Sequence, residues 1–127
     1  MFSAKINNNY IQFIDPEFIH EDGRGLLAQI SSNRKWSQVN YIKSDIGAIR
    51  GNHYHQLNRE LFYVIDGRFT ITLEKDNDKL IYDIVAGDMF IVEPFVRHSF
   101  EYLEKTMLIT MYDKGVQLEN GKMDIIT

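Results

Sequence analysis

Residues 47–67 of the chain, GAIRGNHYHQLNRELFYVIDG, decide its fold. Successive side chains of a β-strand point to opposite faces, so His53 and His55, two positions apart, are expected to point the same way. Glu60 follows the short polar stretch 56–59, which predicts a turn into the next strand. His98 must then arrive from a distant strand, and only a closed or two-layer β fold brings it there.

His53, His55, Glu60 and His98 form a candidate ligand set, and three of the four histidines of the chain belong to it. Imidazole nitrogens combined with a carboxylate suit zinc, iron(II), manganese or nickel. We therefore predict one divalent metal ion, with solvent or substrate in its open positions. A single histidine on a strand is usually a satisfied core or surface residue, as we expect for His20, but the spacing of the set favours metal binding.

Length and composition indicate a single domain over residues 1–127, with its core at about 10–112. No cysteine is present, which excludes disulfides and thiolate ligands and fits a reducing cytoplasm, where we expect the protein. Residues 1–9 hold no apolar signal segment, and no apolar run is long enough to cross a membrane. The net charge of −4 argues against nucleic-acid binding, whereas a small anionic ligand needs only a few local arginines.

The hydrophobic pattern along the chain has a period of two, and β-branched and aromatic residues dominate its apolar runs. The predicted strands are Tyr10–Ile14, Gly25–Ser31, Trp36–Ser44, Ile49–His55, Glu60–Ile65, Arg68–Glu74, Lys79–Val85, Met89–Val92, Arg97–Tyr102 and Thr106–Tyr112. Turns are indicated at Asp66-Gly67, at 74–79 and at 86–88. These features predict an all-β double-sheet jelly roll with little helix.

The spacing of Gly47, His53, His55, Glu60 and Gly67 resembles the first signature of the cupin superfamily at every fixed position. The second signature is present in part, as Gly87-Asp88 followed by Pro94 and His98. The departures from it are Glu93 in place of a proline, Phe95 in place of a glycine and Tyr102 in place of an asparagine. The resemblance implies a double-stranded β-helix, the cupin jelly roll, in a single domain.

A second resemblance covers roughly residues 19–112 and rests on the segments 22–25, 38–44 and 47–54. They are similar to the sugar-nucleotide branch of the cupins, which includes dTDP-4-dehydrorhamnose 3,5-epimerases and dTDP-4-keto-6-deoxyglucose 3,4-ketoisomerases. The sequence of residues 51–55, Gly-Asn-His-Tyr-His, is similar to that of the cupin domain fused to reductases in capsular-polysaccharide synthesis. The resemblance implies a nucleotide-sugar ligand, an isomerase or epimerase of a 4-keto sugar in surface-polysaccharide synthesis, and, by family analogy, a homodimer.

The same resemblance gives His53 two roles that exclude each other. In metal-free epimerases the matching histidine is the catalytic base, and in metal-bearing relatives it is a ligand, yet its lone pair serves only one purpose. We favour coordination, because His55 and Glu60 complete the set. Another group then moves the proton, and the candidates are Tyr54, Tyr63, Tyr102 and a metal-bound water.

Candidate substrate-binding residues are Arg50, Arg24, Gln38 and Asn52. The arginines could hold a phosphate through their planar fork, or pair with acidic neighbours. The two amides could bind sugar hydroxyls or satisfy backbone groups. Strict alternation would place Arg50 on the face opposite His53, unless Gly51 hosts a β-bulge.

Two other classes of function fit the same pattern. One is a metal-dependent oxygenase or another small-molecule cupin enzyme, which needs a redox-active metal. The other is a non-catalytic cupin that binds a small ligand. The Arg24-Gly25 and Arg50-Gly51 elements favour sugar nucleotides over oxygenase substrates, and the full ligand set favours metal chemistry over a bare binding module.

Overall fold

β-Strands and turns make up the regular structure, and a computed structural model describes all residues, 1–127. The strands are β1 (Ile11–Phe13), β2 (Phe18–Asp22), β3 (Gly25–Gln29), β4 (Gln38–Ser44), β5 (Ile49–His53), β6 (Glu60–Asp66), β7 (Arg68–Lys75), β8 (Asp78–Val85), β9 (Met89–Val92), β10 (Arg97–Tyr102) and β11 (Thr106–Tyr112). No helix in the structure has the length and apolarity needed to cross a membrane.

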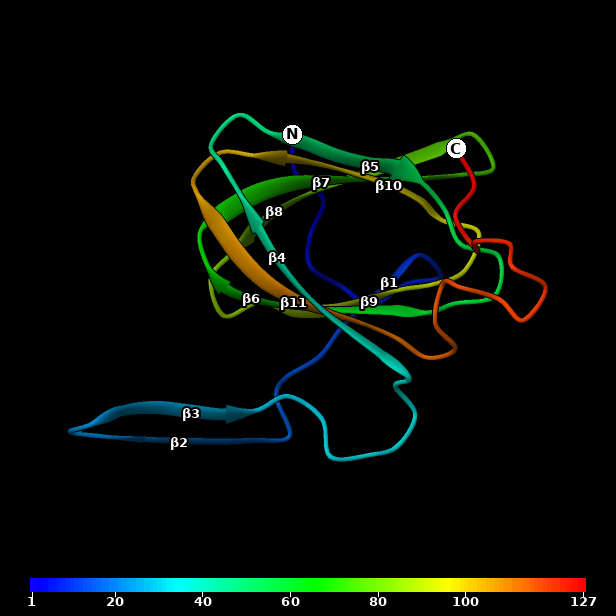
Figure 1. Cartoon of the computed structure of the whole chain (residues 1–127). Coiled ribbons are helices and arrows are strands. Elements are labelled where there is room, and N and C mark those ends of the chain that lie inside the picture. The colour runs from blue at the N-terminus through cyan, green and yellow to red at the C-terminus, as the bar shows by residue number, and fades with distance from the viewer.

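Two antiparallel sheets face each other across the core, as Figure 1 shows. One sheet has the order β1-β9-β6-β11-β4 and the other has the order β5-β10-β7-β8. Neighbours in each sheet are distant in sequence, for example β10 beside β5, so the sheets interleave as they do in a jelly roll. The predicted all-β jelly roll is therefore confirmed.

Alternating side chains of both sheets fill the space between them. In β7 and β11 every second residue is buried, and the core cluster includes Phe69, Phe90, Phe100 and Leu108. Phe62 stacks on Phe90 with ring centroids 4.9 Å apart. The predicted period of two thus marks the residues that point inward.

The ten predicted strands are present, and β9, β10 and β11 have the predicted bounds. One strand, β2, was missed, because all five of its residues are exposed and no buried face imposes a period of two. The strand predicted at 49–55 ends at His53, where the chain leaves the sheet.

The predicted turn at Asp66-Gly67 joins β6 to β7, and the requirement for glycine there has two causes. The backbone of Gly67 has a φ of 103°, and a Cβ atom on it would lie 2.6 Å from the carbonyl oxygen of Lys105. The turn at 74–79 closes on Asp76 and Asn77, which both have positive φ, as a two-residue hairpin turn requires.

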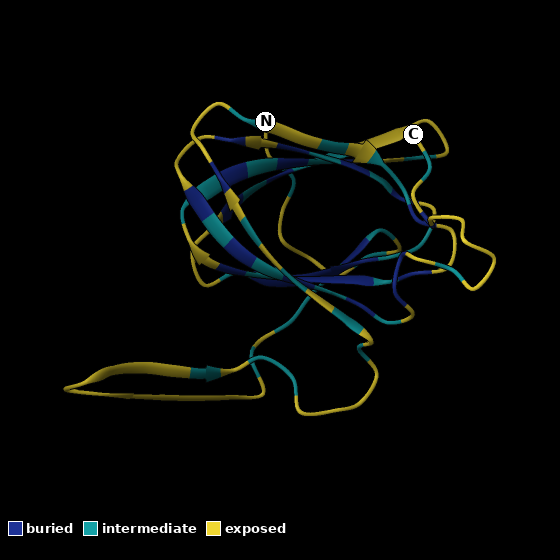
Figure 2. Cartoon of the chain, viewed as in Figure 1, coloured by how far each residue is buried: buried dark blue, intermediate teal, exposed yellow.

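A hairpin made of β2 and β3 projects from the two-sheet shell (Figure 1). Nearly all of its residues are exposed, in contrast to the largely buried strands of the shell (Figure 2). Its strands pair only with each other. The hairpin thus adds nothing to the core of its own chain.

Candidate functional site

The four predicted ligand residues converge at one end of the interior of the shell. His53 ends β5, His55 follows it, Glu60 begins β6, and His98 lies in β10 opposite His53. Nitrogen atoms of the three imidazoles lie within 4.8 Å of one another. A carboxylate oxygen of Glu60 is 3.2 Å from Nε2 of His55 and 3.5 Å from Nε2 of His98.

Hydrogen bonds of the His55 and His98 imidazoles determine which ring nitrogen directs its lone pair toward the cluster. Nδ1 of His55 donates to the carbonyl of Asp124 at 2.6 Å, and Nδ1 of His98 donates to the carbonyl of Val96 at 3.0 Å. In a neutral imidazole the other nitrogen is then an acceptor. Both Nε2 atoms therefore bring a lone pair toward a carboxylate that also has only acceptors, and Nε2 of His98 is buried without a hydrogen-bond partner. A cation between these groups resolves the conflict.

Burial and neighbouring charge shift the titration of the cluster. Burial opposes ionisation of Glu60, but the imidazoles of His55 and His98 beside its carboxylate outweigh this effect and hold its pKa at about 2. Burial, with the positive charge of His98 and His55, lowers the pKa of His53 to about 4. Burial disfavours protonated His55, yet its bonds to Glu60 and to the Asp124 carbonyl raise its pKa overall. At neutral pH the site presents one carboxylate and a neutral His53.

A β-bulge in β5 brings Arg50 and His53 to the same cavity. His98 pairs with His53 and Ser99 pairs with Gly51, so one extra residue stands in β5, where Gly51 and Asn52 have φ of 86° and 60°. A Cβ on Gly51 would lie 2.7 Å from the carbonyl oxygen of His98. The bulge that the sequence left open at this glycine is therefore present.

The turn before His98 carries Phe95 where the cupin signature has a glycine. Phe95 has a φ of 66°, so it takes the left-handed backbone that the usual glycine would supply. Its N–H donates to the carbonyl of His55 at 2.7 Å, which holds this turn against the ligand strand. Glu93 pairs with Arg59 at 2.6 Å on the partly exposed rim, as a structural ion pair.

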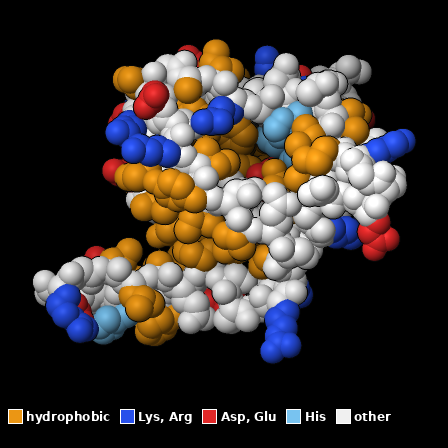
Figure 3. Space-filling view, viewed as in Figure 1, with side chains coloured by type: hydrophobic (Ala, Val, Ile, Leu, Met, Phe, Trp, Pro, Cys, Tyr) orange, Lys and Arg blue, Asp and Glu red, His pale blue; other side chains and the backbone are white.

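A cavity of about 190 Å³ opens onto the cluster. Its lining combines polar and aromatic residues of both sheets, namely Ile42, Arg50, Gly51, His53, Glu60, Phe62, His98, Phe100, Tyr102, Leu108 and Tyr112. Figure 3 shows histidine atoms among hydrophobic ones at a hollow in the shell. A small ligand would therefore meet apolar walls with a few polar groups, which is typical of binding sites.

Two tyrosines reach the cavity, and sequence reasoning identified only one of them. Burial raises the pKa of Tyr102, against the opposing effects of Ser44 and Arg50, and burial together with Glu60 raises the pKa of Tyr112. Both phenols are thus protonated donors at neutral pH. Tyr112 was missed although it continues the inward phase of β11, on which Leu108 and Thr110 are also buried.

Other predicted residues lie elsewhere. Tyr54 is outside the cavity lining, under the guanidinium of Arg97, whose carbon lies 5.3 Å from the ring centre. Arg24 is exposed on the hairpin and pairs with Asp22 at 2.6 Å. His20, exposed on the same hairpin, is the predicted surface histidine.

Of the two amides that we considered for sugar binding, that of Gln38 contacts protein groups and that of Asn52 is exposed. Gln38 accepts a hydrogen bond from the N–H of Val116 at 2.9 Å, and its own amide faces Asn40. The carbonyl of Asn52 accepts a bond from Arg97, and its side chain is exposed. Tyr63 packs on the outer side of its sheet with the small cluster of Leu61, Met89 and Ile91.

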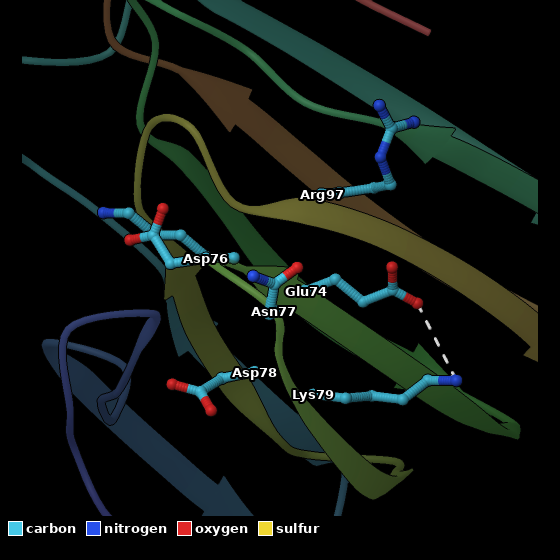
Figure 4. Close-up of a pocket in the computed structure, with 7 residues that line it drawn as sticks. Glu74, Asp76, Asn77, Asp78, Lys79 and Arg97 are labelled. Carbon is cyan, nitrogen blue, oxygen red and sulfur yellow. Dashed lines mark ion pairs between the residues drawn. The ribbon is translucent and has the colours of Figure 1, made fainter.

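A larger hollow lies away from this site, at the turn between β7 and β8 (Figure 4). It is lined only by polar and charged residues, and Glu74 and Lys79 pair across its side at 3.8 Å. The head group of Arg97 points away from the carboxylates of the turn in this view. The hollow therefore resembles a solvated surface turn, whereas the cavity at the histidines combines burial with converging polar groups.

Comparison with known proteins places the chain in a family. The model of the polysaccharide biosynthesis C-terminal domain matches residues 20–124, most of the chain. The chain belongs to this family. The sequence resemblance to proteins of polysaccharide synthesis is thereby confirmed at the family level, and residues 20–124 contain every predicted ligand and Asp124, whose carbonyl contacts His55.

Solved structures share the fold of this polysaccharide biosynthesis C-terminal domain. A sugar 3,4-ketoisomerase from Thermoanaerobacterium thermosaccharolyticum in complex with TDP has a TM-score of 0.77 and 19% identity, over 92% of this chain and 87% of that one. A dTDP-4-dehydrorhamnose 3,5-epimerase from Sulfolobus tokodaii has a TM-score of 0.70 and 19% identity, over 86% and 72%.

A capsular polysaccharide assembling protein from Staphylococcus aureus has a TM-score of 0.61 and 23% identity, over 86% of this chain and 31% of that one. This chain therefore corresponds to about a third of that larger protein. At these identities the three likenesses establish the cupin-like fold.

Proposed function

We propose that this domain binds one divalent metal ion and isomerises or epimerises a nucleotide-activated 4-keto sugar in surface-polysaccharide synthesis. The observation that carries the proposal is the buried meeting of Glu60 with the Nε2 lone pairs of His55 and His98. The family match and the fold shared with sugar-nucleotide isomerases and epimerases support the substrate class.

The residues present fit a metal ion. His53, His55, Glu60 and His98 would hold it, and their nitrogen and carboxylate donors suit zinc, iron(II), manganese or nickel. When bound, the ion supplies a Lewis acid beside the carbonyl of the sugar. Two of the imidazoles are already oriented by hydrogen bonds from Nδ1 to backbone carbonyls, as is usual for metal-ligating histidines.

Side chains of the cavity account for binding and proton handling in this proposal. Arg50 lies at the exposed rim, anchored to Ser44 by a bond of 2.7 Å and to the Lys43 carbonyl by one of 3.3 Å, and its remaining N–H groups would bind a diphosphate. Tyr102 presents a protonated hydroxyl toward the sugar oxygen that gains negative charge when a proton leaves carbon 3. A base at the cavity takes the proton from carbon 3 and returns a proton to the sugar, so the overall reaction is redox-neutral; among the lining residues the unprotonated imidazole of His53 is that base where it is not a ligand.

One alternative is favoured by a specific observation. The low pKa of His53 leaves its imidazole neutral and half-buried at the cavity, where it could serve as a catalytic base instead of a ligand. Elemental analysis of gently purified protein, with a His55→Ala variant beside it, separates the two roles. We expect about one ion per chain in the parent and loss of the ion in the variant. Equal metal-free behaviour of both proteins would return His53 to the role of base.

Activity is tested by exchange of the proton at carbon 3. We expect solvent deuterium to enter that position when the protein is incubated with dTDP- or UDP-linked 4-keto sugars. Absence of deuterium across the whole panel would overturn the proposed reaction. Oxygen consumption with the same metal-loaded protein would instead support the oxygenase alternative.

We also propose a homodimer in which the β2–β3 hairpin takes part. A two-stranded hairpin is marginally stable by itself, and this one exposes Phe18, Ile19, Leu26 and Leu27 to roughly half of their possible area or more. Hydrophobic side chains also gather over the shell where it faces the hairpin (Figure 3), and Val39 and Tyr41 of β4 are about 60% exposed. A second copy would cover both surfaces.

A further inference from the structure

The chain after β11 has little regular structure but returns to the candidate site. Within residues 113–127, Asp124 is 2% exposed, a burial that aspartate reaches only when its carboxylate is paired. Two backbone hydrogen bonds between Tyr54 and Ile126, of 3.0 and 2.9 Å, fasten the segment beside the ligand strand. The N–H of Asp124 donates to the carbonyl of Val116 at 2.7 Å, which fixes its position further.

The carboxylate of Asp124 organises the turn that separates two of the ligands. It accepts hydrogen bonds from three successive backbone N–H groups, those of Gln56, Leu57 and Asn58, at 2.8, 3.0 and 3.1 Å. It also accepts a bond of 2.8 Å from the side-chain amide of Asn58. Consecutive N–H groups that point at one anion form a concave binding site for it, so the carboxylate fixes the backbone conformation of the turn.

The main-chain carbonyl of the same residue orients an imidazole. It accepts the hydrogen bond from Nδ1 of His55 at 2.6 Å, which directs Nε2 of that ring toward Glu60. One residue therefore determines both the backbone between His55 and Glu60 and the direction of the His55 lone pair.

We propose that Asp124 is a positioning residue of the metal site: its carboxylate holds the turn 56–58, and this hold keeps its own carbonyl on Nδ1 of His55. The inference rests on the proposed metal binding. It further states that the metal site depends on the segment 113–127, which is remote from the site in sequence. Partners of this kind typically contribute 10–100-fold to metal affinity, although they never touch the ion.

Asp124→Asn is the variant that tests the proposal, because it keeps the volume of the side chain and removes the charge that three peptide N–H groups share. Dissociation constants for Zn²⁺ and Co²⁺ are measured by chelator competition on protein that elutes as folded material from gel filtration. We expect affinity to fall by about 10–100-fold. Glu119→Gln is the matched control, since it removes a carboxylate from an exposed position of the same segment, and we expect its affinity to equal that of the parent.

A second measurement distinguishes positioning from a merely structural role. Nitrogen NMR of the metal-free protein reports which nitrogen of His55 carries the proton, and we expect Nδ1–H in the parent and a mixed or reversed tautomer in Asp124→Asn. A structural role alone would lower the melting temperature but leave both the tautomer and the affinity of the folded protein unchanged. That result overturns the inference and leaves the metal site intact. Failure of the parent itself to bind either ion overturns the proposed metal binding instead.

Discussion

The β2–β3 hairpin and the segment 113–127 differ in a way that reverses the usual expectation for strands and loops. The hairpin is regular β structure with complete pairing, yet nearly all of its residues are exposed. The C-terminal segment is irregular, yet it buries Asp124 and Val116 and holds His55 of the candidate site in place. Regular β pairing alone therefore does not tell whether a segment contributes to the core or to the candidate site of this molecule.

The two regions differ in the partners with which their polar groups form hydrogen bonds. The hairpin satisfies its backbone within itself, so its side chains are left free for a partner. The C-terminal segment satisfies the backbone of another segment, the turn 56–58, so its own conformation becomes part of the site. Loss of the hairpin surface should therefore affect association, whereas disturbance around the cluster should affect metal binding and folding.

Replacement of a histidine in each region gives the largest expected contrast. In His98→Ala we expect metal affinity to fall by more than about 100-fold, because a buried ligand is lost outright. In His20→Ala, on the hairpin, we expect the metal content of the parent, since His20 is exposed and contacts only Asp22. Metal content by mass spectrometry and affinity by chelator competition check both variants. Full metal content in His98→Ala would remove the case for the site.

A glycine substitution tests how tightly the ligand strand is fixed. In Gly51→Ala we expect the free energy of unfolding to fall by about 2 kcal/mol. The backbone there has a positive φ, and the added Cβ would lie only 2.7 Å from the carbonyl oxygen of His98. Gly121→Ala, in the C-terminal segment, is the matched control. It has a similar φ of 79° but open space around it, so its cost should be about 1 kcal/mol. Urea unfolding measures both, and equal losses would show that the close approach does not matter.

Sequence spacing was sufficient to predict the convergence of His53, His55, Glu60 and His98 and most of the fold. Alternation along strands is local, so His53 and His55 follow from their separation by two, and the buried faces of β7 and β11 follow in the same way. The sequence left open whether Gly51 hosts a bulge, and the structure shows one there. Local backbone rules carry such predictions because they need no knowledge of distant partners.

The remaining features depend on contacts that no local pattern records. β2 lacks a buried face, so nothing in its own side chains indicates a strand. Asp124 lies far along the chain from the turn that it caps, and its sequence neighbours give no signal of that contact. Tyr54 alternates with the ligand histidines and therefore points away from the cavity, toward Arg97, a consequence of the same rule that located His53.

Replacement of Arg50 at the cavity rim tests whether the ligand carries phosphates, with a smaller expected effect than the substitutions above. In Arg50→Lys we expect affinity for dTDP to fall about tenfold, because lysine keeps the charge but lacks the planar fork that matches a phosphate. Metal content should stay at the parent level, since Arg50 bonds Ser44 and the Lys43 carbonyl rather than the ligands. Calorimetric titration measures the affinity, and Arg34→Lys, at an exposed arginine away from the cavity, is the control. Unchanged affinity in Arg50→Lys would mean that the phosphates lie elsewhere.

A substitution on the β2–β3 hairpin should have the smallest effect on folding, in contrast to changes around the C-terminal segment. Leu26 is 55% exposed and stands directly opposite Glu21, so lysine at this position gains an ion-pair partner across the strands while an apolar contact surface is lost. In Leu26→Lys we expect the free energy of unfolding of the monomer to change by less than about 0.5 kcal/mol. The dissociation constant of the homodimer should rise about fivefold, equivalent to about 1 kcal/mol.

Sedimentation equilibrium measures the association, with Gln29→Lys as a control that adds the same charge to the hairpin without removing an apolar side chain. A monomer in every sample, the parent included, would contradict the proposed dimer, whereas equal weakening in both variants would assign the effect to charge alone.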